Sequence, residues 1–514
     1  MSLALRLPPL TERPAHPPEI RPSRVAQWLT EASTREPGFA ARIIGEALAA
    51  TNRVAMSHAR RLDLTEQYWK TAALLWPRLE HRFIRASHPL QGDDLEAAKA
   101  ALMLATELAS AYKRLLAGEA SRRLRWGGPR RAVALVRRTF QAISRVLANS
   151  YLSYAPVPAN TWYDAHEIYM YTRERKIHRH PVTLDQPDVT LERLYLQSLL
   201  LALANPYGFL PSQLAMVFHY LQENAHLAKL TPVPPVHRMA KAVAIVPVGH
   251  DFPPFSANKG GNAEGSKLFL LTFDLAFQLQ EQIRALESGA ALPREAGSDA
   301  DARGRYIALL KRLLRQWAIP PARQFNRLPS RARVVMCAGL PGVWHYSRGM
   351  QNGAAHGTAA PPPMTQCQVV NHTSGGYALR QIDPSPSALR VGDLIALRVE
   401  GRAGLQVAMV RWFRNTLASA MLEFGCELLS DAPEAAAAAA ENAPEGDLQP
   451  VLVLPEENGA DAGGPAAQLA APAGAFALEQ AVSLRRGAGT GFAVLTKLVE
   501  QGPGFDLYEF VAVN

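Results

Sequence analysis

Cysteine and long apolar runs are both scarce in this sequence, and each scarcity excludes a class of protein. Its 514 residues include only three cysteines, which are too few and too scattered for a disulfide framework or a zinc site. The best candidate for a membrane span, residues 194–203, is interrupted by Gln197 and falls short of the ~20 apolar residues that cross a bilayer. The first residues also lack an apolar core with a small-residue cleavage site. We therefore expect a cytoplasmic protein without a membrane span, in which the cysteines are small buried hydrophobes: Cys337, Cys367 and Cys426.

The signatures of common enzyme classes are missing as well. The sequence holds no Gly-x-Ser-x-Gly, no His-Glu-x-x-His and no kinase-type set of motifs. Residues 260–267 approach a phosphate-binding loop, but their serine and lysine stand in the reverse order. No known metal site has the ligand spacing of His178 and His180 with Asp164, His166 and Glu167 upstream. We therefore expect no catalysis, no metal and no cofactor.

Acidic residues are in the minority along most of the chain but not in its last part. The net charge is +10, yet residues 431–514 hold twelve acidic and three basic residues, a balance of −9 that leaves +19 on residues 1–430. This asymmetry fits a basic body that meets acidic partners, an acidic domain that docks on that body, or arginine on solvated helix faces. Because no basic stripe interleaved with aromatics and no helix-turn-helix signature accompanies the charge, we do not expect a nucleic-acid partner.

The hydrophobic pattern predicts a helical part first. Residues 1–23 are rich in proline, and residues 24–318 show the three- and four-residue spacing of amphipathic helices. Pro77 is expected to kink or restart one of these helices. That helix carries an apolar stripe: Leu64, Tyr68, Ala72, Leu75 and Leu79. Short polar breaks suggest a helical array without a clear repeat period, and residues 242–248 indicate a strand within it.

Residues 319–432 have the pattern of a small barrel or sandwich, because short apolar segments alternate with turns that contain glycine or proline. The expected strands cover residues 334–339, 367–370, 377–379, 394–399, 406–413 and 422–429. Between the first two, residues 347–363 form an insertion rich in Gly, Ala and Pro. Residues 433–448 include six consecutive alanines and are expected to be a linker or a solvated helix. Residues 449–514 return to β-type sequence, as an appended domain or as extra strands of the barrel.

Two polar motifs in this β part favour one kind of ligand. Arg323 and Arg327 offer two guanidinium groups four positions apart, just before the first expected strand. Arginine binds phosphate in a bidentate fork and stacks on purine rings. Further along, residues 371–376 form a polar turn between two apolar stretches, in which Asn371 and Thr373 offer hydrogen-bonding side chains. Together the two motifs predict a receptor site for a small anionic nucleotide.

The order of these motifs and of the strands after them resembles the PilZ domain, a bacterial receptor module for cyclic di-GMP. That family carries an Arg-x-x-x-Arg loop, then Asp/Asn-x-Ser-x-x-Gly, then a six-stranded β-barrel. The segments 389–397, 410–412 and 424–428 match its later strands, so the resemblance covers about residues 319–432. It implies a multidomain α + β fold with a large, mainly α-helical N-terminal body, a small six-stranded PilZ-like β-barrel and a short β-rich C-terminal region.

The resemblance also implies which residues hold the ligand. Arg323 and Arg327 would bind its phosphates and bases, and Asn371 and Thr373 a guanine edge, with Thr373 where Ser is usual. Gly376 would let the backbone pass close to the ligand. Two further candidates are Arg331 and Ser374. Arg327 and Arg331 repeat the spacing of the first arginine pair, so the pair in use is either 323/327 or 327/331.

The function expected on this basis is that of a bacterial signalling effector. It would bind cyclic di-GMP through the PilZ-like barrel and pass the signal to the helical body, which would bind a protein partner. Because Arg323 and Arg327 lie between the helical part and the barrel, we expect the ligand to act on both. The alternative is a ligand-free PilZ-like adaptor or scaffold that works by protein–protein interaction.

Overall fold

The computed structural model divides the chain into two compact units. The first consists of residues 1–86 and 90–323, and the second of residues 87–89 and 324–514. The structure describes residues 3–11, 16–121, 128–183, 186–235, 242–257, 265–298, 301–318, 327–352, 361–382, 388–417, 421–441, 447–455, 467–487 and 489–513. Within this part of the chain, no helix is both long and apolar enough to cross a membrane.

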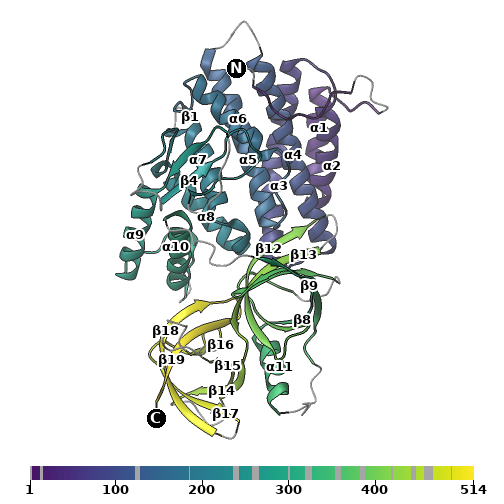
Figure 1. The fold of residues 1–514 in the computed structure, drawn as a ribbon. Helices are drawn as coiled ribbons and strands as arrows, with labels where there is room; N and C mark the ends of the chain where they lie inside the picture. Colours follow the sequence, from purple (N-terminus) through teal and green to yellow (C-terminus); the bar gives the residue numbers. More distant parts are fainter. Residues whose placement is uncertain are drawn as a thin grey trace. The chain divides into compact units, whose positions relative to one another are not determined.

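Helices make up most of the first unit (Figure 1). They are α1 (Pro22–Ser33), α2 (Pro37–Asn52), α3 (His58–Arg85), α4 (Gly92–Ala120), α5 (Gly128–Leu152), α6 (Thr161–Glu174), α7 (Leu191–Leu203), α8 (Pro211–Asn224), α9 (Phe273–Glu287) and α10 (Ala302–Ala318). Helix α4 is at the centre of the first helices, where it packs against α2, α3 and α5. Thirteen of its residues are buried, many of them alanines, which lets the neighbouring helices approach closely.

The predicted apolar stripe of α3 is confirmed. Its five residues from Leu64 to Leu79 are all at most 2% exposed, as expected of one helix face turned to the core. Pro77 lies inside α3 without ending it, so the helix does not restart at this position, and a kink there stays a prediction. The proline removes one backbone N–H donor, but the buried stripe on both sides of it continues without interruption.

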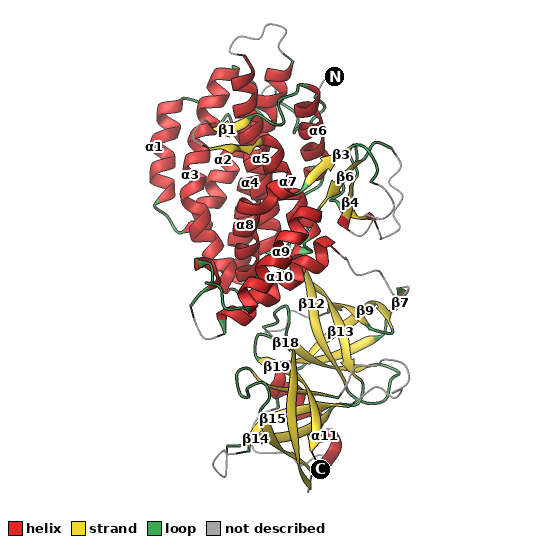
Figure 2. Cartoon of the chain, turned by 90° about the vertical axis from the view of Figure 1, so that its left-hand side faces the viewer, coloured by secondary structure: helices red, strands yellow, loops and turns green. Residues whose placement is uncertain are grey.

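A small antiparallel sheet interrupts the helical unit and lies beside its helices (Figure 2). Its strands follow the order β3 (Lys229–Thr231), β6 (Leu268–Leu271), β4 (Val243–Val246), β5 (Phe255–Ser256). Strand β4 confirms the strand predicted within residues 242–248. A two-stranded hairpin, β1 (Pro181–Thr183) and β2 (Gln186–Thr190), precedes α7.

The second unit begins with the predicted six-stranded barrel. Its strands are β8 (Arg333–Ala338), β9 (Thr365–Thr373), β10 (Gly376–Gln381), β11 (Leu394–Val399), β12 (Gln406–Thr416) and β13 (Met421–Ser430). They close a ring in the order β8-β9-β10-β13-β12-β11, and a short β7 (Leu328–Pro329) adds to the outside of β9. All six predicted strands are confirmed, and the three cysteines are buried free thiols in them.

A second closed barrel follows, and it corrects our prediction for the alanine-rich run. Residues 434–440 are neither linker nor solvated helix but a strand, β14 (Glu434–Ala440). The barrel order is β14, β15 (Gln449–Leu454), β16 (Gln468–Pro472), β19 (Phe505–Val513), β18 (Gly489–Gln501), β17 (Ala481–Arg486). Ala436 and Ala438 point into the barrel core, where a larger side chain would not fit beside Val451 and Val482. Tertiary packing here overrides the helix preference of alanine.

Between β8 and β9 lies a helix that we did not predict, α11 (Leu340–Asn352), which overlaps the start of the expected insertion. Its residues Leu340 and Val343 join one buried cluster with residues of both barrels, among them Met409 of the first and Leu507 of the second. The indole Nε1 of Trp344 donates to the carbonyl of Ala436 in β14 at 2.7 Å. Helix α11 therefore packs between the two barrels and ties them together.

Candidate ligand-binding site

The arginine motif is described only from its second member onward. Arg323 lies outside the described residues, whereas Arg327 is the first described residue of the second unit's main segment and is exposed. Directly after it, β7 pairs with β9, so that Leu328 stands opposite His372 and Pro329 opposite Asn371. Continuing this register by one residue sets Arg327 level with Thr373. The two motifs predicted from sequence therefore meet on neighbouring strands.

The chain stays beside β9 after β7 ends. The backbone N–H of Ser330 donates to the carbonyl of Val370 at 3.3 Å, and the amide of Gln368 donates to the carbonyl of Arg331 at 3.4 Å. Arg331 is exposed, like Arg327, and lies on the same segment. Both members of the second possible arginine pair are thus placed along β9, and the choice between the pairs 323/327 and 327/331 stays open.

The second motif forms the tip of the β9–β10 hairpin. Thr373 pairs with Gly376 across a two-residue turn in which Ser374 is exposed. Asn371 and Thr373 are two residues apart on β9, so their side chains point to the same side of the sheet. Both are half-buried. This arrangement presents an amide and a hydroxyl side by side, next to the arginine-bearing segment.

Gly376 is required by the packing of its own strand. A Cβ at this position would lie 2.1 Å from the carbonyl oxygen of Cys426 on β13 and would collide with it. The backbone at Gly376 also has φ +154°, which disfavours other residues. The glycine of the motif therefore holds β10 tightly against β13, whatever it does for a ligand.

A tryptophan that we did not single out for the site lies on the same outer face. The strand registers align Asn371, Ala378, Gly425 and Trp412 in one row across β9, β10, β13 and β12. The indole of Trp412 fills the space above Gly425, since a Cβ there would be 1.9 Å from its Nε1. Ala378 and Gly425 have little or no side chain and are buried, and the half-buried indole of Trp412 covers Gly425 in the row that leads to Asn371.

Burial in the structure, rather than alternation in the sequence, shows on which side Trp412 lies, because the bulge at Arg411 shifts the register of β12. Phe413, its neighbour, is fully buried and faces the barrel core, so Trp412 must face outward. Aromatic side chains offer a flat apolar surface to ligands, and an aromatic residue opposite a strand glycine also covers that glycine.

Arginine dominates the charge around this face. Arg414 places its guanidinium 5.7 Å from the centre of the Trp412 ring, and Arg380 forms an ion pair with Glu423 at 3.0 Å. Glu423 stands opposite both arginines in the strand registers. With Arg327 and Arg331 nearby on the β9 side, cationic groups outnumber the carboxylate on this part of the barrel. The face suits an anion with flat rings.

Arg411, next to Trp412, connects this face to the second barrel. It is the bulged residue of β12, and its guanidinium donates to Glu427 of the first barrel and to Glu500 of the second. Burial opposes the charge of Arg411, but these two hydrogen-bonded carboxylates outweigh burial and raise its pKa. The residue next to Trp412 is thus in direct contact with β18 of the second barrel.

The polar group considered as a metal site has another explanation. Asp164 is fully buried and forms an ion pair with Lys113 at 2.7 Å, while His166 bonds to the hydroxyl of Tyr195 and the carbonyl of Phe252. Burial lowers the pKa of His166 to about 4, so the ring is neutral. Among the described residues, no group of three or more His, Cys, Asp or Glu side chains is arranged to hold a metal ion.

Comparison with known proteins gives three consecutive family matches. Residues 23–235 match the model "Cyclic-di-GMP receptor FimW, N-terminal domain", residues 349–436 the "middle PilZ domain" of the same receptor, and residues 435–513 the "FimW C-terminal beta-barrel domain". The middle match includes Asn371 and Trp412 but begins after Arg327. The boundary between the second and third matches falls at β14, where the second barrel begins.

A curated relative agrees with these matches over most of both chains. The cyclic-di-GMP receptor FimW of Pseudomonas aeruginosa is 22% identical over 503 residues, which cover 84% of this chain and 81% of the relative. The resemblance that the motifs indicated is confirmed, together with the fold class that it implied. The chain belongs to the PilZ-domain proteins.

Proposed function

We propose that this chain is a receptor for cyclic di-GMP and binds it on the outer face of the first barrel. The observation that carries the proposal is the pairing of β7 with β9, because it sets Arg327 beside the Asn371–Thr373 hairpin. The relative's identity as a cyclic-di-GMP receptor supports the choice of ligand. The proposed function is binding without turnover.

The roles follow from the chemistry of the ligand, which has two phosphodiester charges and two guanines. Arg327, with Arg323 or Arg331 as its partner, supplies guanidinium forks for the phosphates. Asn371 and Thr373 bond a guanine edge, and the half-buried ring of Trp412 offers a stacking surface for a base. Each charge-assisted hydrogen bond contributes about 1.5–3 kcal/mol, and each base stacked on an aromatic ring about 1–3 kcal/mol.

Calorimetric titration of the full-length chain with cyclic di-GMP tests the proposal. We expect saturable binding by the wild type and loss of affinity by at least about tenfold in Arg327→Ala, Asn371→Ala and Trp412→Ala, since tenfold corresponds to about 1.4 kcal/mol. Arg323→Ala and Arg331→Ala, made separately, decide which arginine acts with Arg327. Arg485→Ala, an exposed arginine on β17 of the second barrel, is the matched control and should bind like the wild type.

Absence of binding by a folded wild-type protein would reject the receptor and favour the ligand-free adaptor. Trp412→Phe refines the role of the indole: it should keep most of the affinity, because a flat ring remains for stacking. Recovery of unchanged nucleotide after prolonged incubation, checked by chromatography, tests binding without turnover.

The finer part of the proposal is that the bound nucleotide changes what the helical unit presents to a protein partner. The support is sequence order, because the Arg323–Arg327 segment follows α10 directly and precedes β7. Limited proteolysis with and without cyclic di-GMP should show that the nucleotide protects residues 319–327 of the wild type from cleavage. A variant that does not bind the nucleotide should show no such protection. Identical cleavage in both conditions, with binding intact, would separate ligand binding from signalling and reject the second.

A further inference from the structure

Residues 3–11, within the proline-rich N-terminal segment, lie along the helices of the first unit as an extended strap. The backbone N–H of Arg6 donates to Asp164 of α6 at 2.8 Å, and Lys113 of α4 donates to the carbonyl of Arg6 at 3.1 Å. Asp164 and Lys113 also pair with each other at 2.7 Å. The Asp164–Lys113 ion pair thus satisfies both the backbone N–H and the backbone carbonyl of Arg6, as a neighbouring β-strand would. Asp164 is fully buried, so this is a built feature of the helical unit.

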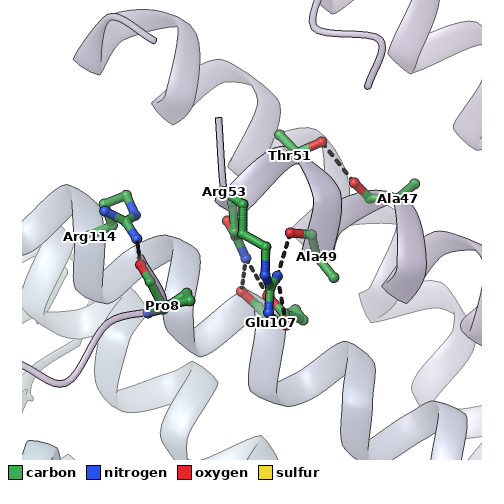
Figure 3. Close-up of polar contacts among 8 residues, drawn as sticks. Pro8, Ala47, Ala49, Thr51, Arg53, Glu107 and Arg114 are labelled. Atoms are coloured by element: carbon green, nitrogen blue, oxygen red, sulfur yellow. Dashed lines mark hydrogen bonds and ion pairs between the residues drawn. The ribbon is translucent and has the colours of Figure 1, made fainter. Parts of the chain in front are cut away.

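The helices also hold the backbone of the strap further along. Arg114 of α4 donates to the carbonyl of Pro8 (Figure 3). The backbone N–H of Thr11 donates to the carbonyl of Arg53 at 2.7 Å. Arg53 itself is fixed by hydrogen bonds to Glu107 and to the carbonyl of Ala49. Thr11 forms a parallel bridge with Val54. Because these contacts go to main-chain atoms, the helical unit recognises an extended backbone rather than one sequence.

The side chains of the strap add a simple pattern. Leu3, Leu5 and Leu7 are half-buried, while Ala4 and Arg6 between them are exposed. An extended chain turns alternate side chains to opposite sides, so the leucines face the helices. The surface beneath residues 3–11, which we call the strap groove, therefore takes an apolar side chain at every second position.

The strap is an imperfect occupant of this groove. Its leucines keep part of their surface in water, and Leu10 is 46% exposed. Beneath its second half, burial and then the nearby charge of Arg53 lower the pKa of Arg114. The strap offers this cation only the neutral carbonyl of Pro8. An occupant held in this way is readily replaced by a competing segment.

We propose that the strap groove is a docking site for an extended segment of a partner protein with an apolar residue at every second position, and that residues 3–11 occupy it as an internal competitor. The groove residues Asp164, Lys113 and Arg114 belong to the part of the chain that matches the N-terminal domain model, residues 23–235. The strap lies before that match. The proposal concerns the helical unit alone and stands whether or not the barrel binds nucleotide.

Fluorescence polarisation with a labelled peptide of residues 2–12 tests this in the full-length chain. An attached strap competes at an effective concentration of order millimolar, so the wild type should bind the peptide weakly. The variant Leu3→Ser/Leu5→Ser/Leu7→Ser releases its own strap and should bind the same peptide about 10- to 100-fold more tightly. A peptide of equal composition with its leucines placed consecutively should not bind.

A second variant protects the test against misfolding of the first. Arg6→Pro removes the strap N–H that Asp164 accepts and leaves the leucines in place, so it should also open the groove. Adding Lys113→Met and Asp164→Asn to either open variant should abolish peptide binding while circular dichroism stays unchanged. If both open variants are folded and bind the peptide no better than the wild type, the groove is not a docking site and the strap is only structural. Equal binding of the two peptides would likewise overturn the proposal.

Discussion

Single residues decide how the outer face of the first barrel is shaped. Gly376 and Gly425 look alike in the sequence, but their surroundings differ. A Cβ on Gly376 would meet a backbone carbonyl of β13 at 2.1 Å, whereas one on Gly425 would meet the Trp412 indole at 1.9 Å. Backbone in a closed barrel has no room to retreat, while an indole on an outer face can rotate away. Gly376 is therefore required for the fold, whereas Gly425 is required for the position of the Trp412 ring.

This difference predicts opposite outcomes for two alanine substitutions. Gly376→Ala should destabilise the second unit by about 2–4 kcal/mol, in the range of severe overpacking and backbone strain. Gly425→Ala should cost about 1 kcal/mol or less in stability but weaken cyclic di-GMP binding as Trp412→Ala does. Urea denaturation and calorimetry of both variants check this. Equal loss of stability in the two would show that the indole is held as rigidly as the backbone.

Asp393 gives a second prediction at this scale, on pH. Its carboxylate is 8% exposed and accepts a hydrogen bond from the backbone N–H of Arg390, but burial prevails and raises its pKa from 3.8 to about 6. The folded state therefore prefers the protonated acid. The stability that this group contributes is fully present below pH 3.8 and is lost as the pH rises through about 6.

Asp393→Asn keeps an acceptor for Arg390 and cannot ionise. Relative to the wild type, the variant should gain about 1–3 kcal/mol as the pH rises from 4 to 8, since one pKa unit corresponds to about 1.4 kcal/mol. The difference between the two unfolding curves, measured at several pH values, isolates this group from all other carboxyls. A difference that does not change with pH would contradict a raised pKa at this position.

At the scale of elements, the strands of the first barrel were predictable because local pattern and tertiary role agree. Strand β11 occupies the residues expected for it, 394–399, and its neighbours differ only at their ends. The two motifs were predictable as residue types, but their meeting was not, because β7 is only two residues long and exposed. Helix α11 was hidden by glycine and proline, which helix propensity penalises but packing between two barrels outweighs.

The alanine run shows where local pattern fails. Alanine is the best helix former, yet β14 is a strand because it closes a barrel between β15 and β17. Its burial alternates, with Ala436 and Ala438 inside and the residues between them half-buried. A run of identical residues contains no period, so a sequence cannot reveal which of its members face a core.

The two sides of β14 predict a contrast that neither a linker nor a solvated helix would produce. Ala438→Lys puts a charge into a fully buried site and should destabilise the unit by about 3 kcal/mol or more. Ala439→Lys, opposite Ser483 on the other face, should change stability by less than about 1 kcal/mol. Urea midpoints of the two variants provide the measurement, and similar midpoints would argue against the alternation.

At the scale of the whole molecule, the second unit consists of two barrels that share a buried cluster. The strands where the barrels meet are buried on both faces. In β15, Val451 and Val453 point into the second barrel, while Leu452 and Leu454 join the cluster shared with α11 and the first barrel. Strands buried on both faces appear in a sequence as continuous apolar runs rather than alternation. The same signal is present in β11, where four residues in succession are buried.

This shared core predicts that damage to one barrel spreads to the other. Leu507 and Val511 both lie on β19, but Leu507 is 2% exposed and belongs to the shared cluster, whereas Val511 is 59% exposed. Leu507→Lys removes apolar contacts that Met409 and Val407 of the first barrel also need, so hydrogen exchange should quicken in β11 and β12 as well as in the second barrel. Val511→Lys, the matched control, should leave exchange unchanged in both barrels.

Faster exchange confined to residues 434–513 in the Leu507 variant would show that the barrels are independent domains. If it spreads as expected, a ligand on the face of β12 acts on a cooperative unit that includes both barrels, which Arg411 connects through its bonds to Glu427 and Glu500.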